Sequence, residues 1–261
     1  MLLINKSPGP TSHDIVDEVR RITGVKKVGH AGTLDPFAEG LLIVLVGREE
    51  TRRQAEFLNM DKVYEATFVL GEERDTDDVM GKVRHLDGGS SFDSRTDRSS
   101  LPASEADLRS RTADPAKAGT KLSGAPRAPR DRKPAPSIQD VEKALQKFTG
   151  EQEQMPPDYS AKKIKGKKAY ELAREGKKVE LKPKRVTVYE LELLEYNYPE
   201  LKIRVKVSSG TYIRAIARDI GRDLGIGAYV KELKRTEIGE YKLERAKTLE
   251  ALRKDHKGGI L

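Results

Sequence analysis

The stretch H-A-G-T-L-D-P-F-A-E-G-L-L-I-V-L-V-G, residues 30–47, joins a glycine-rich turn to a continuous apolar run. Residues 41–47 have the length and composition of a central strand that is covered on both faces. Just before this run, Asp35 precedes Pro36 in a segment with glycines at 29, 32 and 40. An aspartate in such a turn either closes an Asx-turn or presents a carboxylate for chemistry. The stretch therefore predicts a buried strand and leaves both roles open for Asp35.

Hydrophobic spacing predicts strands and helices along the rest of the chain. Thr11 or Ser12 can cap a helix whose apolar residues recur at helical spacing until Gly24 ends it. Ser137 and Asp140 predict a capping box at the start of another helix. Further strands are expected at 1–5, 62–71, 186–194 and 201–207, and further helices at about 169–174 and after 208–210. Because these elements do not alternate as regular βαβ units, they favour an α+β fold with a mixed or antiparallel sheet.

The segment from about Leu86 to Pro136 differs in composition from the rest of the chain. It is rich in Ser, Arg, Asp, Ala, Pro and Gly, and it contains no Ile, Val, Met or Tyr. Such a segment cannot bury enough apolar surface to offset the entropy lost on ordering. We therefore expect residues 86–136 to form a disordered or weakly ordered insertion.

The overall composition favours a polyanionic partner and a reducing compartment. Charged residues make up 35% of the chain, and the formal net charge is +8. This excess is typical of proteins that bind nucleic acid, although a solvated surface rich in Lys, Arg and Glu gives the same count. The lack of cysteine excludes disulfides, thiolate nucleophiles and cysteine-type zinc sites. No apolar run approaches the roughly 18 residues that span a bilayer, so we expect a cytoplasmic protein without a membrane segment.

The sequence offers little for a metal ion or a nucleotide cofactor. Its four histidines, at 13, 30, 85 and 256, are scattered and lack ligand spacing. The run D-T-D-D-V-M-G, residues 75–81, begins like a calcium loop, but Val79 and Met80 occupy positions where a further ligand and the turn glycine are required. No Walker A motif and no G-x-S-x-G motif is present. We therefore predict that the protein uses no metal ion.

Carboxylates, arginines and tyrosines remain as candidates for chemistry. Tyr64 lies on an expected strand, where aromatic packing is its ordinary role. Tyr212 and Arg214 follow a strand-to-helix turn, a place where side chains point either into a cleft or simply into solvent. Leu233, taken alone, is a core residue. None of these four residues indicates a function by itself.

Read together, five blocks of the chain resemble TruB-type tRNA pseudouridine synthases, and they stand in the order of that family. The resemblance covers nearly the whole chain outside residues 86–136. The blocks are G-H-A-G-T-L-D-P-F-A-E-G-L-L, K-V-Y-E-A-T-F-V-L-G-E-E-R-D-T-D-D-V-M-G, M-P-P-D-Y-S-A-K-K-I-K-G-K-K-A-Y-E-L-A-R-E-G, S-S-G-T-Y-I-R-A-I-A-R-D-I-G and L-K-R-T-E-I-G.

This resemblance implies a fold, an activity and a domain organisation. The implied fold is a single pseudouridine synthase domain, residues 1–261, with a mixed, mostly antiparallel central sheet flanked by helices. The implied activity is the isomerisation of uridine 55 in the TΨC loop of tRNA to pseudouridine, without a cofactor. The C-terminal PUA domain of many relatives is expected to be absent from this chain, since it ends soon after T-L-E-A-L.

The resemblance also assigns roles to individual residues. Asp35 matches the catalytic aspartate, and Tyr64 matches the tyrosine that stacks against the target base. Arg214 matches the arginine that pairs with the aspartate. The other matches border the pocket or the flipped RNA bases, and they are Tyr212, Leu233 and His30.

The resemblance further identifies residues 149–176 as a thumb that grips the T-arm of tRNA. Its lysines are expected to meet RNA phosphates, so binding should weaken steeply with salt. These lysines are Lys162, Lys163, Lys165, Lys167 and Lys168. We expect a monomer, because no long exposed apolar stripe indicates a partner subunit.

The residue types suit the implied chemistry. Pseudouridine formation detaches uracil from C1′, rotates it and rejoins it through C5, on a nucleotide that must first be flipped out of the RNA. An ionised carboxylate beside the sugar can attack C1′ or assist loss of the C2′ proton, and a paired guanidinium keeps that carboxylate charged. An aromatic ring under the base adds stacking of about 1–3 kcal/mol. Neither a metal ion nor a redox group is needed.

Two other functions remain open on the sequence. One is a guide-RNA-dependent pseudouridine synthase of box H/ACA particles, which shares the G-T-L-D-P turn. The other is a tRNA-binding chaperone with weak or no catalysis, acting through the same basic surface. Activity on a bare tRNA transcript distinguishes the enzyme from both.

Overall fold

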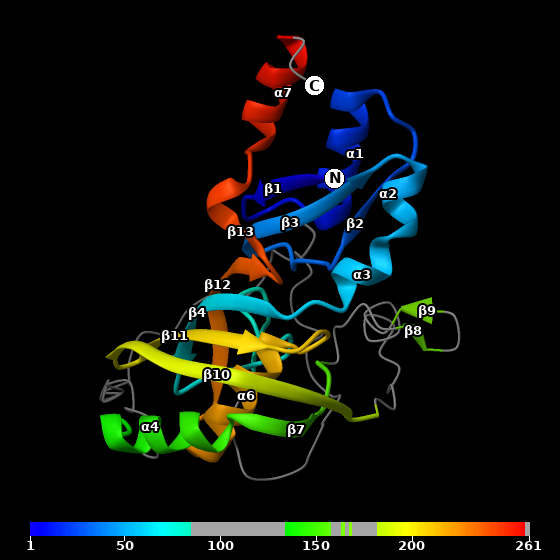
Figure 1. The fold of residues 1–261 in the computed structure, drawn as a ribbon. Coiled ribbons are helices and arrows are strands. Elements are labelled where there is room, and N and C mark those ends of the chain that lie inside the picture. Colours follow the sequence, from blue (N-terminus) through cyan, green and yellow to red (C-terminus); the bar gives the residue numbers. More distant parts are fainter. Residues whose placement is uncertain (85–133, 158–162, 165–166, 169–181, 259–261) are drawn as a thin grey trace, which may run out of the picture. The chain divides into compact units, whose positions relative to one another are not determined.

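One mixed sheet organises the part of the chain that the structure describes (Figure 1). The computed structural model describes residues 1–84, 134–157, 163–164, 167–168 and 182–258. These residues belong to one compact unit, made of residues 1–86 and 133–261. The predicted insertion at 86–136, apart from its last three residues, and the predicted helix at 169–174 lie outside the described residues.

The strands of the main sheet come from both ends of the sequence. They are β1 (Leu2–Lys6), β2 (Val28–Ala31), β3 (Glu39–Val46), β4 (Lys62–Leu70), β7 (Gly150–Gln154), β10 (Lys184–Asn197), β11 (Glu200–Val207), β12 (Ala228–Ile238) and β13 (Tyr241–Lys242). Two short hairpins pair β5 (Glu73–Arg74) with β6 (Val83–Arg84) and β8 (Lys163–Ile164) with β9 (Lys167–Lys168). The helices are α1 (Ser12–Thr23), α2 (Arg48–Arg52), α3 (Gln54–Leu58), α4 (Ile138–Lys147), α6 (Ile213–Asp223), α7 (Leu249–Lys257) and the 3₁₀ helix η1 (Leu243–Arg245).

The main sheet has the strand order β1-β3-β12-β4-β11-β10-β7, with β2 paired to β3 and β13 paired to β12. Strands β3 and β12 run parallel, and the other paired strands in the described residues run antiparallel. The family fold expected from the sequence, α+β with a mixed, mostly antiparallel sheet, is therefore confirmed. Strand β12 is central to the sheet, because it joins the N-terminal strands to the antiparallel strands β4, β11 and β10.

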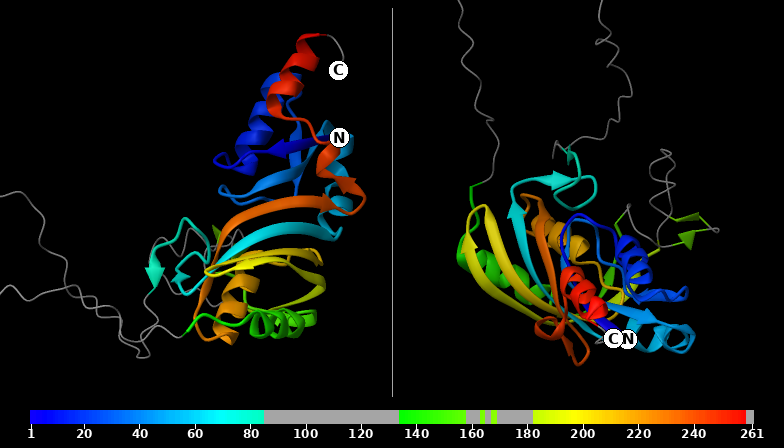
Figure 2. Two further views of the ribbon diagram at one scale, coloured as in Figure 1. Left: turned by 90° about the vertical axis from the view of Figure 1, so that its left-hand side faces the viewer. Right: turned by 90° about the horizontal axis from the view of Figure 1, so that it is seen from above.

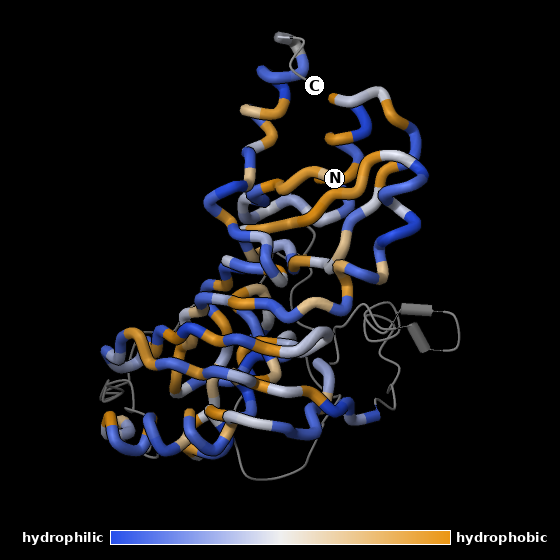
Figure 3. The backbone as a smooth tube through the Cα atoms, in the orientation of Figure 1, coloured by the Kyte–Doolittle hydropathy of each residue, from blue (hydrophilic) through white to orange (hydrophobic). Residues whose placement is uncertain are grey.

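Strand β3 is the buried strand that residues 41–47 predict. Its residues 40–45 are buried, because other elements cover it on both faces. The strand is hydrophobic over most of its length (Figure 3). On one face, α1 and α7 pack their apolar side chains against β1 and β3. On the other face, Phe57 of α3 and residues around η1 complete a second cluster. This enclosure fixes the start of β3, and with it the turn that carries Asp35.

The other half of the sheet is covered by α4 and α6. Both helices lie on the same side of β10 and β11 (Figure 2), and they bury their apolar faces against β4, β10, β11 and β12. Strand β11 alternates as predicted, with Leu201, Ile203, Val205 and Val207 buried in this core. The basic residues between them face away from α4 and α6. Helix α6 is thereby held against the sheet, and it packs mainly on β12.

The predicted helix starts agree with the structure. Thr11 and Asp14 form a capping box on α1, and Gly24 ends that helix in the left-handed conformation. Ser137 and Asp140 form the second capping box, on α4. Among the described residues, no helix is long and apolar enough to cross a membrane.

Candidate active site

A cavity of about 560 Å³ lies where the turn before β3, the loop after β11 and strands β4 and β12 meet. Residues 32–35 form one wall, and residues 207–214 form the opposite wall. The volume falls within the range of about 300–1,000 Å³ that is typical of small-ligand sites. Four segments of the sequence thus meet in one cavity, and Asp35 is one of its lining residues.

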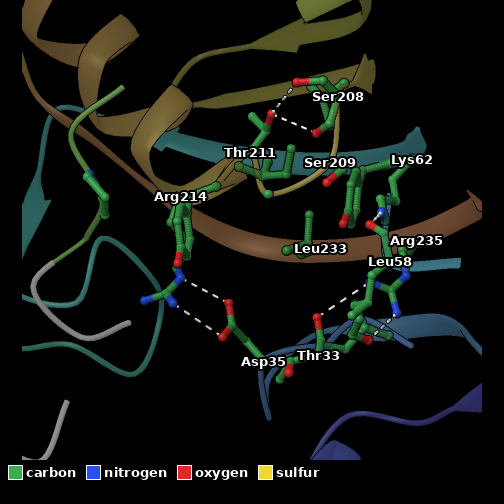
Figure 4. A pocket seen from close by; sticks show the side chains of 18 of the residues that line it. Thr33, Asp35, Leu58, Lys62, Ser208, Ser209, Thr211, Arg214, Leu233 and Arg235 are labelled. Atoms are coloured by element: carbon green, nitrogen blue, oxygen red, sulfur yellow. Dashed lines mark hydrogen bonds and ion pairs between the residues drawn. The ribbon is translucent and has the colours of Figure 1, made fainter. Parts of the chain in front are cut away.

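Asp35 and Arg214 point toward each other at this cavity (Figure 4). The Nε of Arg214 lies 3.0 Å from Oδ2 of Asp35, and its Nη2 lies 3.2 Å from Oδ1. Such a two-point contact between guanidinium and carboxylate fixes both orientation and charge. The Arg214 side chain is 6% exposed, whereas the Asp35 side chain is 33% exposed. The pair therefore combines a buried cation with a carboxylate that a ligand can reach.

The side chain of Asp35 does not close its own turn. Within the described residues, its carboxylate bonds to Arg214 and to no main-chain N–H. The Asx-turn that the sequence left open is therefore wrong. The turn is closed instead by the main chain, where the N–H of Ala38 donates to the carbonyl oxygen of Asp35 at 3.1 Å.

Two buried cations hold the main chain on either side of Asp35. Arg235 of β12 is 1% exposed and donates to the carbonyls of Gly32, Thr33 and Leu41 at 3.0, 3.4 and 2.8 Å. Gly40, at φ 107°, leaves the room that this approach needs, because a Cβ there would lie 2.3 Å from the carbonyl oxygen of Arg235. These contacts anchor the turn before Asp35 to the central strand.

Lys6 holds the other side of the turn. Its ammonium donates to the carbonyls of Pro36 and Ala38 at 3.2 and 2.6 Å, and burial lowers the pKa of Lys6 to about 8. The hydroxyl of Ser12 donates to the carbonyl of Leu34 and accepts from its N–H. Residues on β1, α1 and β12 together bind five main-chain carbonyls between residues 32 and 38. Asp35 is therefore presented by a rigid turn.

Helix α6 carries a row of arginines whose partners the sequence did not reveal. Arginines at every fourth position of the helix meet acidic residues from the segment that starts at β5. The pairs are Arg214 with Asp78 at 3.2 Å, Arg218 with Asp77 at 3.2 Å, and Arg222 with Glu73 at 2.9 Å. The D-T-D-D run, considered as a poor calcium loop, thus supplies counter-charges to this helix. The regular arginine spacing was the signal that could have indicated acidic partners.

Burial is the main influence on the pKa values of Asp77 and Asp78. It raises the pKa of Asp77 to about 6, even though Arg218 acts in the opposite direction. Burial also raises the pKa of Asp78, against a hydrogen bond from Thr76 and the charge of Arg214. Arg214 thus joins two carboxylates of different exposure, Asp78 in the interior and Asp35 at the cavity.

Three further residues that the resemblance selects also line the cavity. Tyr64 on β4 and Leu233 on β12 are 8% and 7% exposed, and each presents part of its side chain to the cavity. Tyr212 lies at the start of α6, where it is the N-cap residue. The structure therefore brings together Asp35, Tyr64, Tyr212, Arg214 and Leu233.

His30 does not line this cavity. It lies on β2, where the side chain of Gln54 donates to its carbonyl oxygen at 2.6 Å. Burial and the nearby charge of Arg235 lower the pKa of His30, so the ring is uncharged near neutral pH. Its buried Nδ1 has no hydrogen-bond partner within the described residues.

The structure does not describe the side chains of the lysines that are predicted to bind RNA. Lys162 and Lys165 lie outside the described residues, and for Lys163, Lys167 and Lys168 only the strands β8 and β9 are described. Residues 150–154, which the predicted thumb includes, form strand β7 and pair with β10.

Two lysines that the sequence did not single out line the cavity. Lys62, at the start of β4, donates to the carbonyl of Leu58 at 2.7 Å, and burial lowers the pKa of Lys62 to about 8. Lys184, at the start of β10, donates to the carbonyl of Ser209 at 2.9 Å. Both add positive charge to the cavity, which suits an anionic ligand. Within the described residues, no group of three or more His, Asp or Glu side chains is arranged to hold a metal ion.

Comparison with known families gives this geometry a context. Residues 20–96 and 118–213 match the N-terminal domain of the TruB family of pseudouridylate synthases. Residues 214–257 match the C-terminal domain of tRNA pseudouridylate synthase B. The chain therefore belongs to the TruB family of pseudouridylate synthases, as the resemblance of its five blocks predicts.

Curated relatives support the same assignment over nearly the full chain. The tRNA pseudouridine synthase B of Protochlamydia amoebophila is 40% identical over 244 residues, which cover 94% of this chain and 76% of that protein. The protein of the same name from Aquifex aeolicus is 40% identical over 251 residues, which cover 95% of this chain and 71% of that protein.

Solved structures share the fold at lower identity. A structure of an H/ACA RNP bound to a substrate RNA containing 2′-deoxyuridine matches with a TM-score of 0.61 at 23% identity. A Cbf5–Nop10–Gar1 complex matches with a TM-score of 0.63 at 24% identity. Each match covers 100% of this chain, which spans only 55% and 56% of the two solved chains.

Proposed function

We propose that this chain is a stand-alone tRNA pseudouridine synthase that converts uridine 55 in the TΨC loop to pseudouridine, with Asp35 as the catalytic residue. The observation that carries the proposal is the accessible carboxylate of Asp35, held at two points by the buried guanidinium of Arg214 beside a cavity of about 560 Å³. Membership of the TruB family and the names of the curated relatives support the reaction type.

In this proposal the carboxylate of Asp35 acts at the ribose of a flipped-out nucleotide. The reaction breaks the bond from C1′ to N1 of uracil and forms a bond from C1′ to C5, and the proton on C5 is lost while N1 gains one. Asp35 either attacks C1′ or assists loss of the C2′ proton. Arg214 orients the carboxylate through its two contacts and supplies the opposite charge beside it.

The cavity walls suit a detached uracil that must rotate in place. Tyr64 and Leu233 offer an aromatic and an aliphatic surface, so they can hold the base by stacking and packing without fixing its edge. Tyr212 borders the same space at the start of α6. A base held in this way can turn to present C5 to C1′.

Binding of tRNA is assigned to the basic surface of the chain. The net charge of +8, the cavity lysines Lys62 and Lys184, and the lysines between residues 162 and 168 favour contact with RNA phosphates. We infer that residues 149–176 are the thumb on the T-arm, that residues 86–136 are a low-complexity insertion in one catalytic domain, and that the protein acts as a monomer in the cytoplasm.

The test is incubation with an unmodified tRNA transcript, without guide RNA, followed by chemical mapping of pseudouridine. The proposal expects pseudouridine at position 55 alone, and none in a control transcript with cytidine at that position. Conversion that requires a guide RNA indicates the box H/ACA type of enzyme. Tight binding of the transcript without any product contradicts the enzyme and favours a tRNA chaperone.

A further inference from the structure

The cavity wall opposite Asp35 is built by a loop rather than by a strand. Residues 208–212 connect β11 to α6, and side chains hold this loop in place. The hydroxyl of Ser208 accepts from the N–H of Thr187 on β10 at 2.9 Å, and the hydroxyl of Thr211 donates to the carbonyl of Ser208 at the same distance. The first half of the loop is therefore tied to β10.

The second half of the loop is tied to the end of β7 by one side chain. Gln154 is 3% exposed, and its amide contacts the main chain of Tyr212 at two points. Its Oε1 accepts from the N–H of Tyr212 at 2.8 Å, and its Nε2 donates to the carbonyl of Tyr212 at 3.1 Å. One side chain can satisfy a main-chain donor and a main-chain acceptor together only if it carries both groups, as an amide does.

This contact sets the start of α6. Tyr212 is the N-cap residue of the helix, and no side chain within the helix caps it. Arg214 follows two residues later and reaches Asp35 from the first turn. A shift of the Tyr212 main chain therefore moves the guanidinium that holds the carboxylate.

A second contact joins the same two segments. Arg218, one turn further along α6, is 7% exposed and donates to the carbonyl of Met155 at 3.0 Å. The next residue, Pro156, lines the cavity. The end of β7 is therefore attached to α6 at two successive residues, just before the chain leaves the sheet.

We propose that Gln154 is a positioning residue of the active site. Its amide holds the main chain of Tyr212, and through it the helix that carries Arg214, in register with the carboxylate of Asp35. The proposal rests on the proposed function and assigns to Gln154 a role in the geometry of the reacting pair, without contact to the RNA. The residue acts on the chemical step more than on tRNA binding.

The test uses substitutions that change the hydrogen bonding of Gln154 but keep its size. Gln154→Met removes both contacts. Gln154→Glu keeps the acceptor, but an ionised carboxylate repels the carbonyl of Tyr212, whereas a protonated carboxyl restores both contacts. The matched control is Gln152→Glu on the same strand, since the amide of Gln152 donates to the carbonyl of Phe148 outside the cavity. Single-turnover rates on the tRNA transcript are measured from pH 5.5 to 8.5 and divided by the wild-type rate.

The expected results differ between the three variants. At pH 8.5, Gln154→Glu and Gln154→Met are each slower than wild type by on the order of tenfold, with transcript affinity changed by about twofold or less. For Gln154→Glu the relative rate rises as the pH falls to 5.5, because a carboxyl at this position, where Gln154 is 3% exposed, has a pKa raised by burial and regains its proton. For Gln154→Met it stays low at all pH values, and for Gln152→Glu it stays within about twofold of wild type.

Several outcomes overturn the proposal. A pH-independent relative rate for Gln154→Glu contradicts it, and so does a Gln154→Met rate within twofold of wild type. A loss that follows the fraction of unfolded protein, measured by circular dichroism at the assay temperature, also contradicts it, because Gln154 would then be merely structural. If the wild-type chain forms no pseudouridine, the proposed function fails as well, and the wild-type reaction therefore separates the two failures.

Discussion

Helices α1 and α6 begin in opposite ways. Helix α1 caps itself: the hydroxyl of Thr11 accepts from the N–H of Asp14 at 3.1 Å, and the carboxylate of Asp14 accepts from the N–H of Thr11 at 2.8 Å. Helix α6 starts at Tyr212, which has no side-chain capping bond within the helix, and the amide of Gln154 binds its main chain from β7. One helix start is local and the other depends on tertiary structure.

The difference reflects what each helix does. Helix α1 covers β1 and β3, so its first residue is free to be a capping residue. Helix α6 presents Arg214 to Asp35, and its N-cap position is occupied by a tyrosine that lines the cavity. The contact that holds the N-cap residue of α6 is consequently supplied by a residue 58 positions away in the sequence. Substitutions that disturb the start of α6 or Arg214 should therefore affect catalysis, whereas substitution of the α1 capping residue Thr11 should affect stability alone.

Among the contacts that distinguish the two helices, the largest effect is expected for Arg214→Gln. A neutral amide cannot hold the charge of Asp35 and leaves the buried Asp78 without its cation. We expect kcat to fall by about 10²- to 10³-fold, the usual result of removing one electrostatic contact from an active site, with transcript affinity changed only a few-fold. Single-turnover conversion and filter binding with the tRNA transcript measure the two quantities.

The matched control is Arg222→Gln on the same helix. Arg222 pairs with Glu73 outside the cavity and has a side chain that is 51% exposed. Its substitution should leave kcat within about twofold of wild type for the folded protein. Equal losses in the two variants would mean that α6 tolerates no substitution of arginine, and the comparison between the two helices would fail.

The next effect concerns the turn that presents Asp35. Arg235→Met removes the donor for the buried carbonyl of Leu41 and for the part-buried carbonyls of Gly32 and Thr33. We expect the free energy of unfolding to fall by about 3 kcal/mol, because the carbonyl of Leu41 loses its buried partner and the turn loses two further hydrogen bonds. Urea titration measures this value, and Lys234→Met on the exposed side of the same strand should change it by at most about 0.5 kcal/mol. A loss below 1 kcal/mol for Arg235→Met would contradict the anchoring role.

The elements that depend on nearby residues could be predicted from the sequence. The capping boxes at Thr11 and Ser137, the buried strand at 41–47 and the alternation of β11 all express a pattern within a few residues. Strand β7 was not predicted, because its sequence G-E-Q-E-Q has no apolar alternation. It is a strand only because β10 supplies its hydrogen-bond partners.

The candidate site was predicted in part, and through family resemblance rather than periodicity. The resemblance named Asp35, Tyr64, Tyr212, Arg214 and Leu233, and these residues line one cavity. The sequence did not predict the residues that hold the main chain around the site, which are Lys6, Ser12, Gln154 and Arg235. Their side chains form hydrogen bonds with main-chain carbonyl and N–H groups that are distant in the sequence. Contacts of this kind depend on the folded main chain, and no local pattern records them.

A smaller effect is expected at α1. Thr11→Ala removes the capping bond to the N–H of Asp14, and such a loss costs about 1 kcal/mol of stability. Urea titration should detect this change, and Thr11→Ser should restore most of it. The kcat on the tRNA transcript should stay at the wild-type value. A tenfold loss of kcat in Thr11→Ala would show that the local cap also serves the active site.

A further effect depends on pH and tests Asp77, the buried partner of Arg218. Since burial raises the pKa of Asp77 to about 6, the folded state binds its proton more tightly than the unfolded state between about pH 4 and 6. The stabilisation from this group is thus present below pH 4 and is lost as the pH rises to 6. Relative to Asp77→Asn, the wild-type melting temperature should fall across this interval. A relative rise would indicate that the Arg218 contact outweighs burial.

The central claim is that the carboxylate of Asp35 is the catalytic group that acts at the ribose of the target uridine. Asp35→Asn keeps the size of the side chain and removes the charge that Arg214 holds. In single-turnover reactions with an unmodified tRNA transcript, followed by pseudouridine mapping, the variant should form no detectable product while it binds the transcript within a few-fold of wild type. A variant that converts the transcript at a rate within tenfold of wild type would contradict the account.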